Sequence, residues 1–169
     1  MARNTENILN RVADLHTEIL VAGAGVIGIS IARRFAMAGC KTILVEKESA
    51  IGTATSSRNS GVIHAGLYYP DNSLKQMLCL QGKELLYEYC VEKAIPFKQL
   101  GKWVVATTAC EQERLEHLYE RALQNEVPVR LLSKAEVHRA RGELECCAIL
   151  ESQSTGIVDT HSLMYSLAY

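Results

Sequence analysis

The sequence predicts an α/β fold that begins with a strand, a helix and a second strand and continues into a mixed α/β portion. Three observations favour it: an apolar run ending in a glycine-rich turn, an amphipathic pattern directly after it, and β-branched runs alternating with helical patterns farther along the 169 residues. With 48% hydrophobic residues and a net charge of −1, the composition is that of an ordinary globular protein. The sequence has no block of basic residues, so nothing in it indicates nucleic acid as a partner.

The glycine-rich turn carries the first functional motif. Residues 18–22 form a short apolar strand pattern that leads into Gly23-Ala24-Gly25-Val26-Ile27-Gly28, a match to GxGxxG. Gly23 permits a tight turn, Gly25 lets the backbone approach a pyrophosphate, and Gly28 allows close contact between helix and strand. The backbone amides at the start of the helix, at Val26 and Ile27, favour an anion. The motif therefore predicts a Rossmann-like βαβ unit.

The helix and the second strand extend this prediction. The helix carries an apolar stripe made of Ile27, Ile31, Phe35 and Ala38. Ala32 is small enough for the helix to lie against the strand, and Gly39 ends it. Glu46 and Lys47 follow the second strand, residues 42–45, and an acid at this place accepts the hydroxyls of an adenosine ribose unless it is only a solvated strand end. An ADP-containing cofactor is predicted, with nicotinamide and flavin both open.

A polar stretch at residues 49–70 stands where a simple nicotinamide-binding unit would continue with another helix and strand. Three segments in and after it are specific: TSSRNSGVIHAGLYYPDNSLKQMLCLQGKELLYEYC, IPFKQLGKWVVAT and STGIVDTHSL. With the glycine motif, they resemble the N-terminal part of the FAD-dependent L-2-hydroxyglutarate dehydrogenase family, within the D-amino-acid-oxidase-like flavoproteins. The resemblance extends from about residue 18 to the end of the chain.

The resemblance implies that residues 55–64 run beside the pyrophosphate, the ribityl chain and the ring of FAD. The residues implied to contact the cofactor there are Thr55, Ser56, Ser57, Arg58, Asn59, Ser60 and His64. Many donors are needed because an unpaired buried polar group costs about 1–3 kcal/mol. Gly61 and Gly66 would let the backbone approach a flat ring. Arg58 would neutralise a phosphate or a substrate carboxylate, or would be a solvent-facing charge.

His64 is the candidate catalytic residue under this resemblance. Oxidation of an α-hydroxy acid sends hydride from Cα to flavin N5 while a base removes the hydroxyl proton, and histidine titrates in the required range. The alternatives are a histidine that orients the cofactor and one that binds flavin covalently. Tyr68 and Tyr69 would line a substrate entrance or pack against the next helix. No residue indicates whether the electron acceptor is a quinone or oxygen.

Three capped helices, three strands and a last helix that reaches the end of the chain are expected after the polar stretch. Ser73 with Gln76, Thr108 with Glu111, and Ser133 with Glu136 match helix-capping patterns. The apolar residues of the first two helices are Leu74, Met77, Leu78, Leu85 and Tyr89, and then Leu115, Leu118, Tyr119 and Ala122. Strands are expected at residues 104–107, 129–132 and 148–151. The six cysteines show no metal-ligand spacing and are expected to be reduced thiols.

The expected organisation combines pieces of two domains. Residues 1–16 are an N-terminal extension, 17–95 the first part of a FAD-binding domain, 96–158 part of a substrate-binding domain, and 159–169 the start of a return to the FAD-binding domain. The chain is therefore expected to be truncated, as an incomplete gene product or as a real short chain that binds another. Uncovered edges of a two-stranded parallel sheet predict poor solubility or self-association.

The function favoured by these features is oxidation of a small α-hydroxy acid, L-2-hydroxyglutarate first, by a FAD-dependent enzyme. The alternatives are a FAD-dependent dehydrogenase of glycerol 3-phosphate or an amino acid, an NAD-dependent Rossmann dehydrogenase, and a non-catalytic nucleotide-binding or interaction fragment. We expect no metal and no transmembrane segment, and an intracellular location in the cytoplasm or the mitochondrion.

Overall fold

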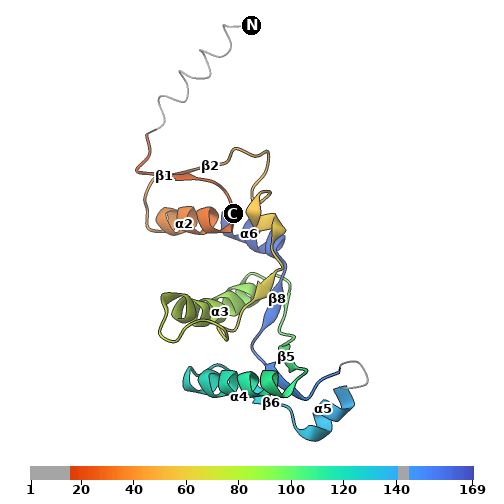
Figure 1. Ribbon diagram of the computed structural model, residues 1–169. Coiled ribbons are helices and arrows are strands. Elements are labelled where there is room, and N and C mark those ends of the chain that lie inside the picture. The colour runs from red at the N-terminus through yellow and green to blue at the C-terminus, as the bar shows by residue number, and fades with distance from the viewer. Residues whose placement is uncertain (1–15, 141–144) are drawn as a thin grey trace. The chain divides into compact units, whose positions relative to one another are not determined.

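The computed structural model describes residues 16–140 and 145–169, which pack into two compact units (Figure 1). Unit 1 extends to Asn59 and includes Thr160–Tyr169, and unit 2 is Ser60–Asp159. Packing alone defines these units. The domain boundaries predicted from the sequence concern cofactor and substrate binding, so they stay predictions.

Unit 1 is the parallel βαβ unit that the glycine motif predicted. β1 (Ile19–Ala22) leads into α2 (Val26–Met37), and β2 (Thr42–Val45) pairs in parallel with β1. The 3₁₀-helix η1 (Thr55–Arg58) and α6 (Thr160–Ala168) complete the unit, and α6 packs against α2.

The apolar stripe predicted on α2 is not its buried face. Ile29 and Ala32 are buried, whereas Ile27 is 72% exposed and Ile31 and Phe35 are exposed as well. A Cβ on Gly28 would lie 3.6 Å from Val21 Cγ1 and even closer to the backbone of the turn. The small residues thus decide which side of α2 meets β1, because only they allow this close approach, and the larger apolar side chains point away.

Two antiparallel sheets of three strands form unit 2. In one, β8 (Gly156–Val158) lies between β3 (Val62–Ile63) and β4 (Phe97–Lys98). In the other, β7 (Ala148–Ser152) lies between β5 (Lys102–Ala106) and β6 (Val129–Leu131). The strands of the second sheet confirm the predicted ones within a few residues. Those of the first sheet were missed, because two or three residues are too few to show an alternating pattern.

α4 (Ala109–Gln124) covers one face of the second sheet as the sequence predicted. Thr108 and Glu111 form the complete capping box, with the Glu111 amide donating to Thr108 Oγ1 at 3.2 Å. Leu115 and Ala122 are buried in one cluster with Leu150 of β7. The predicted apolar face of this helix is therefore confirmed.

α3 (Leu74–Glu92) begins after Ser73, whose Oγ accepts from the Gln76 amide at 3.2 Å, as predicted. The prediction of which side of α3 packs against the core was wrong. Four of the five apolar residues are exposed, namely Leu74, Met77, Leu78 and Leu85, while Gln76, Lys83 and Cys90 are buried. Apolar residues occur around much of this helix, so their spacing did not identify the side that packs. Leu80, which the prediction omitted, packs against the core of unit 2.

α5 (Lys134–Ala140) is capped by Ser133 and anchored through Glu136. The Glu136 amide donates to Ser133 Oγ at 3.4 Å and Ser133 N–H donates to Glu136 Oε2 at 2.8 Å, which confirms the predicted cap. Arg130 Nη1 donates to Glu136 Oε1 at 2.6 Å. Arg130 also donates to Glu151 of β7 at 2.9 Å. The hydrogen bonds from Arg130 and then from Ser133 lower the pKa of Glu136 from 4.5 to about 2. One arginine thereby joins α5, β6 and β7.

The described residues contain no helix with the length and apolar character needed to cross a membrane. Among the same residues, no group of three or more histidine, cysteine or acidic side chains is placed to hold a metal ion. All six cysteines are free thiols.

Glu136 should make the stability of this chain depend on pH. Because its folded pKa lies below 4.5, the carboxylate stabilises the fold above that pH, and this contribution is lost as the pH falls from 4.5 toward about 2. Urea unfolding followed by the fluorescence of Trp103, which donates to Glu151 at 3.2 Å, measures this. We expect the difference in unfolding free energy between wild type and Glu136→Gln to shrink as the pH falls through that interval.

The exposed Glu113 of α4 offers a matched control, because Glu113→Gln also removes one negative charge. A difference between wild type and Glu136→Gln that stayed constant over the interval would contradict the account of the Arg130 network.

Candidate cofactor-binding site

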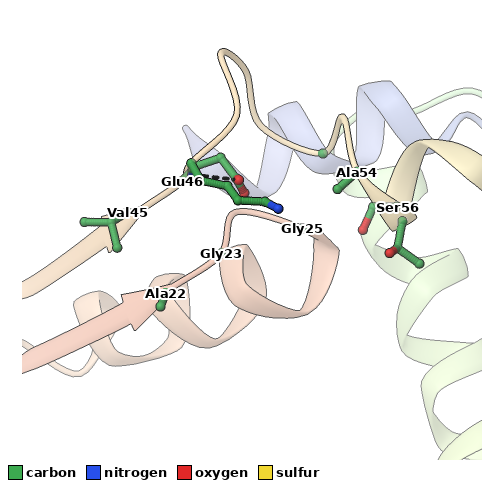
Figure 2. A pocket seen from close by; sticks show the side chains of 10 residues that line it. Ala22, Gly23, Gly25, Val45, Glu46, Ala54 and Ser56 are labelled. Carbon is green, nitrogen blue, oxygen red and sulfur yellow. Dashed lines mark hydrogen bonds between the residues drawn. The ribbon is translucent and has the colours of Figure 1, made fainter.

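A cavity of about 650 Å³ lies in unit 1 beyond the carboxyl ends of β1 and β2 (Figure 2). This is the edge at which ligands bind to open parallel sheets. Its lining comes from the ends of both strands, the glycine turn and the stretch that leads into η1, and consists of Ala22, Gly23, Gly25, Val45, Glu46, Lys47, Gly52, Ala54, Thr55 and Ser56. The structure thus brings Gly23, Gly25, Glu46, Lys47, Thr55 and Ser56 of the predicted site together around one cavity.

The glycine turn needs its glycines for steric reasons. Gly23 has φ of +101°, a conformation that residues with a Cβ rarely adopt. A Cβ on Gly28 would lie 1.9 Å from the carbonyl oxygen of Gly23, which is far inside contact distance. A Cβ on Gly25 would lie 2.9 Å from Ser56 Oγ, the end of a side chain that can rotate. Gly28 is therefore required for the packing of α2. Gly25 lines the cavity without a side chain that would reduce its space.

Glu46 closes the side of the cavity formed by β2. Its Oε2 accepts from the Ala24 amide at 2.6 Å, and its Oε1 accepts from the amides of Lys47 at 2.8 Å and Glu48 at 3.1 Å. The amide of Glu48 first, and then that of Ala24, lower the pKa of Glu46. The side chain is consequently an ionised acceptor at neutral pH, held between the end of β2 and the turn after β1.

Ser56 lies at the opposite side of the glycine turn, at the start of α2 (Figure 2). Its Oγ accepts from the Val26 amide at 3.0 Å. Val26 is the first residue of α2, and the helix has no side-chain cap of its own at Gly25. A hydroxyl oxygen thus occupies a position where the helix start favours an anionic oxygen.

Gly52 is a lining residue that the sequence analysis missed. It has φ of +71°, donates its amide to Ala24 O at 2.8 Å, and a Cβ there would lie 2.5 Å from Met164 Cε of α6. Only its position as an isolated glycine in the polar stretch could have indicated it. Ala22, Val45 and Ala54 were also missed, because small or apolar side chains that line a cavity carry no signal in one sequence.

The other predicted residues are not part of this lining. Val26, Ile27 and Gly28 form the first turn of α2. Ser57 Oγ donates to Thr53 O at 2.9 Å and to Ala54 O at 2.8 Å. Arg58 is exposed and Asn59 Nδ2 donates to Ser56 O. Some polar side chains of this segment thus bond to its own backbone, and the segment forms a 3₁₀ turn rather than a loop without regular structure.

Ser60 and His64 belong to unit 2. His64 follows β3 and is exposed, while its neighbours Ile63 and Ala65 are 3% and 4% exposed. Tyr68 and Tyr69 each lie beneath a lysine, with Lys102 Nζ 4.4 Å from the centre of the Tyr68 ring and Lys75 Nζ 4.5 Å from that of Tyr69. Their role at a substrate entrance stays a prediction.

These features fit the ADP part of a dinucleotide. Glycines leave room for the backbone to approach a pyrophosphate, the start of α2 presents amides, and Glu46 supplies an anionic acceptor for ribose hydroxyls at the end of the second strand. The geometry of unit 1 does not by itself distinguish flavin from nicotinamide.

Comparison with known proteins distinguishes flavin from nicotinamide. Residues 18–169 match the family described as FAD dependent oxidoreductase. L-2-hydroxyglutarate dehydrogenase, mitochondrial, of Arabidopsis thaliana is 45% identical over 157 residues, which cover 92% of this chain and 32% of that protein. The Homo sapiens protein of the same name is 38% identical over 154 residues, 89% of this chain and 33% of that protein. The chain spans about a third of the length of these relatives.

Two solved structures share the fold. L-alpha-glycerophosphate oxidase from Mycoplasma pneumoniae with FAD bound has a TM-score of 0.82 and 28% identity, over 90% of this chain and 41% of that one. Glycine oxidase from Geobacillus kaustophilus has a TM-score of 0.79 and 25% identity, over 90% of this chain and 43% of that one. These structures confirm the predicted α/β fold.

Alanine at the two motif glycines should have different effects in the whole protein. We expect Gly28→Ala to abolish FAD retention and lower the unfolding temperature, because its methyl group meets a backbone carbonyl that cannot rotate away. Gly25→Ala should fold normally and bind FAD more weakly, because its methyl group would displace the hydroxyl of Ser56, which lines the cavity. The ratio of flavin to protein absorbance and a thermal unfolding curve measure both effects. Full FAD content in Gly28→Ala would contradict the assignment of the glycine turn to cofactor binding.

Proposed function

Because the chain belongs to the FAD-dependent oxidoreductase family, we propose that the whole protein oxidises a small α-hydroxy acid, with L-2-hydroxyglutarate as the first candidate. The observation that supports this substrate is the 45% identity, over 92% of this chain, to a protein named for it. Since the chain spans about a third of such relatives, the activity is proposed for the whole protein and not for these residues alone.

FAD is the cofactor of this family, and when bound it accepts the hydride from the substrate carbon. We propose that the residues around the cavity of unit 1 hold its ADP part. Glu46 would accept hydrogen bonds from the ribose, and the amides at the start of α2 would bind the pyrophosphate together with the hydroxyls of Thr55 and Ser56. Arg58, an exposed guanidinium at the end of η1, would neutralise a phosphate or a substrate carboxylate.

We propose His64 as the base that takes the proton of the substrate hydroxyl on an imidazole nitrogen. Its exposed ring is attached to backbone held by two buried neighbours, Ile63 and Ala65. A side chain that must meet a substrate benefits from such a fixed attachment, because misplacement by about 1 Å can slow a reaction by about 100-fold. A role in orienting the cofactor is the alternative.

Oxidation of glycerol 3-phosphate is a second candidate function. It is favoured by the TM-score of 0.82 to L-alpha-glycerophosphate oxidase, although the identity to that structure is only 28%. Turnover of the whole protein with an artificial electron acceptor, compared between L-2-hydroxyglutarate, glycerol 3-phosphate and amino acids, separates the candidates. A kcat/KM highest for glycerol 3-phosphate would replace our first candidate.

The similar dehydrogenases are named as mitochondrial proteins, and we propose the same location for the whole protein. The electron acceptor is proposed to be a quinone or oxygen. Oxygen uptake during turnover without added quinone would identify oxygen, and its absence would favour the quinone.

Replacement of His64 separates chemistry from cofactor support. We expect His64→Asn to keep bound FAD and to reduce the rate of flavin reduction by L-2-hydroxyglutarate about 10²- to 10⁴-fold, the usual contribution of a general base. Stopped-flow absorbance gives the rate, and the flavin to protein ratio gives the FAD content. His117→Asn, which changes an exposed histidine on α4, is the matched control. Loss of FAD from His64→Asn, with a normal rate in the molecules that retain it, would assign His64 to cofactor support.

A further inference from the structure

We propose that Cys79 of α3 is a positioning residue for His64, an inference that rests on the proposed function of that histidine. Cys79 Sγ donates to the carbonyl oxygen of His64 at 3.3 Å. The backbone N–H of Gly66 forms a hydrogen bond to the same sulfur. One side chain of the helix therefore holds both ends of the turn His64-Ala65-Gly66, and the imidazole projects from that turn.

The surrounding backbone leaves this turn little freedom. Ile63 pairs with Gly156 of β8 on one side, and Leu67 is 6% exposed in the core of unit 2 on the other. Gly66 has φ of +80°, and a Cβ there would lie 3.2 Å from Leu80 Cδ2, so the turn also lies directly on α3. The sheet and the core thus fix the flanks of the turn, and Cys79 makes polar contacts with the backbone between them.

To donate a hydrogen bond to the His64 carbonyl, the thiol of Cys79 must be protonated. Burial raises the pKa of Cys79, and the Gly66 amide and the charges of Lys83 and Lys75 oppose that rise only in part. Cys79 thus remains a protonated thiol at neutral pH and keeps the hydrogen that the His64 carbonyl accepts. Of the two lysines on its own helix, Lys83 is paired with Glu84 at 3.0 Å and Lys75 lies over Tyr69.

A partly buried cysteine such as Cys79 can also serve only as a small apolar side chain. Cys90 provides the comparison, because it lies on the same helix, is 1% exposed, and has a pKa raised by burial alone. If Cys79 only fills space, its replacement should resemble that of Cys90. If Cys79 positions His64, its replacement should change the turn and the reaction, and serine should restore both, because a hydroxyl can donate to the same carbonyl.

The test uses the FAD-loaded whole protein as wild type, Cys79→Ala, Cys79→Ser and Cys90→Ala. Hydrogen exchange of the amides at residues 64–67, measured by mass spectrometry, reports the turn without any substrate. The rate of flavin reduction by L-2-hydroxyglutarate as a function of pH reports the reaction. We expect Cys79→Ala to retain FAD, to exchange these amides severalfold faster, and to reduce its flavin at least about tenfold more slowly with a shifted pH profile. Cys79→Ser should return toward wild type, and Cys90→Ala should change only the unfolding temperature.

Unchanged exchange at residues 64–67 in Cys79→Ala would overturn the inference, and so would faster exchange with an unchanged rate and pH profile. Failure of the proposed function has a different signature, because the wild-type flavin would then not be reduced by L-2-hydroxyglutarate. In that case the substrate that does reduce the flavin takes its place, and the same comparison of rates among the variants decides the role of Cys79.

Discussion

The close approach of α2 to the turn after β1 is the contact on which unit 1 depends. At Gly28 the helix comes so near the carbonyl of Gly23 that a single methyl group would not fit. This approach sets the rotation of α2, so that Ile29 and Ala32 become its buried face. It also places the first amides of α2 beside the cavity, where Ser56 reaches the Val26 amide and Glu46 reaches that of Ala24.

Features encoded by neighbouring residues could be predicted from the sequence. The glycine motif, Glu46 after the second strand and the caps at Thr108 and Ser133 each depend on a few consecutive residues, and the structure has them as predicted. The buried faces of α2 and α3 depend instead on what each helix packs against, and both predictions from apolar spacing were wrong. Gly52 was missed for the same reason, since its partner Met164 is distant in the sequence.

The polar segment that begins with η1 combines two tasks within a few residues. Its first part, Thr55 and Ser56, lines the cavity of unit 1, and its later part carries His64 in unit 2. The sequence indicated both residue types but not that a short strand, β3, comes between them. That strand fixes the backbone before His64, and the buried Ala65 follows it, so the proposed contact from Cys79 acts on a backbone that is already held on both sides.

The proposed roles of His64 and Cys79 both depend on the oxidation of L-2-hydroxyglutarate by the FAD of the whole protein. Anaerobic titration of the purified flavoprotein, followed by its visible spectrum, tests it most directly because no external electron acceptor is involved. We expect stoichiometric L-2-hydroxyglutarate to bleach the flavin spectrum and to be converted into the corresponding 2-oxo acid. A flavin that stays oxidised with L-2-hydroxyglutarate but is bleached by glycerol 3-phosphate or an amino acid would contradict it.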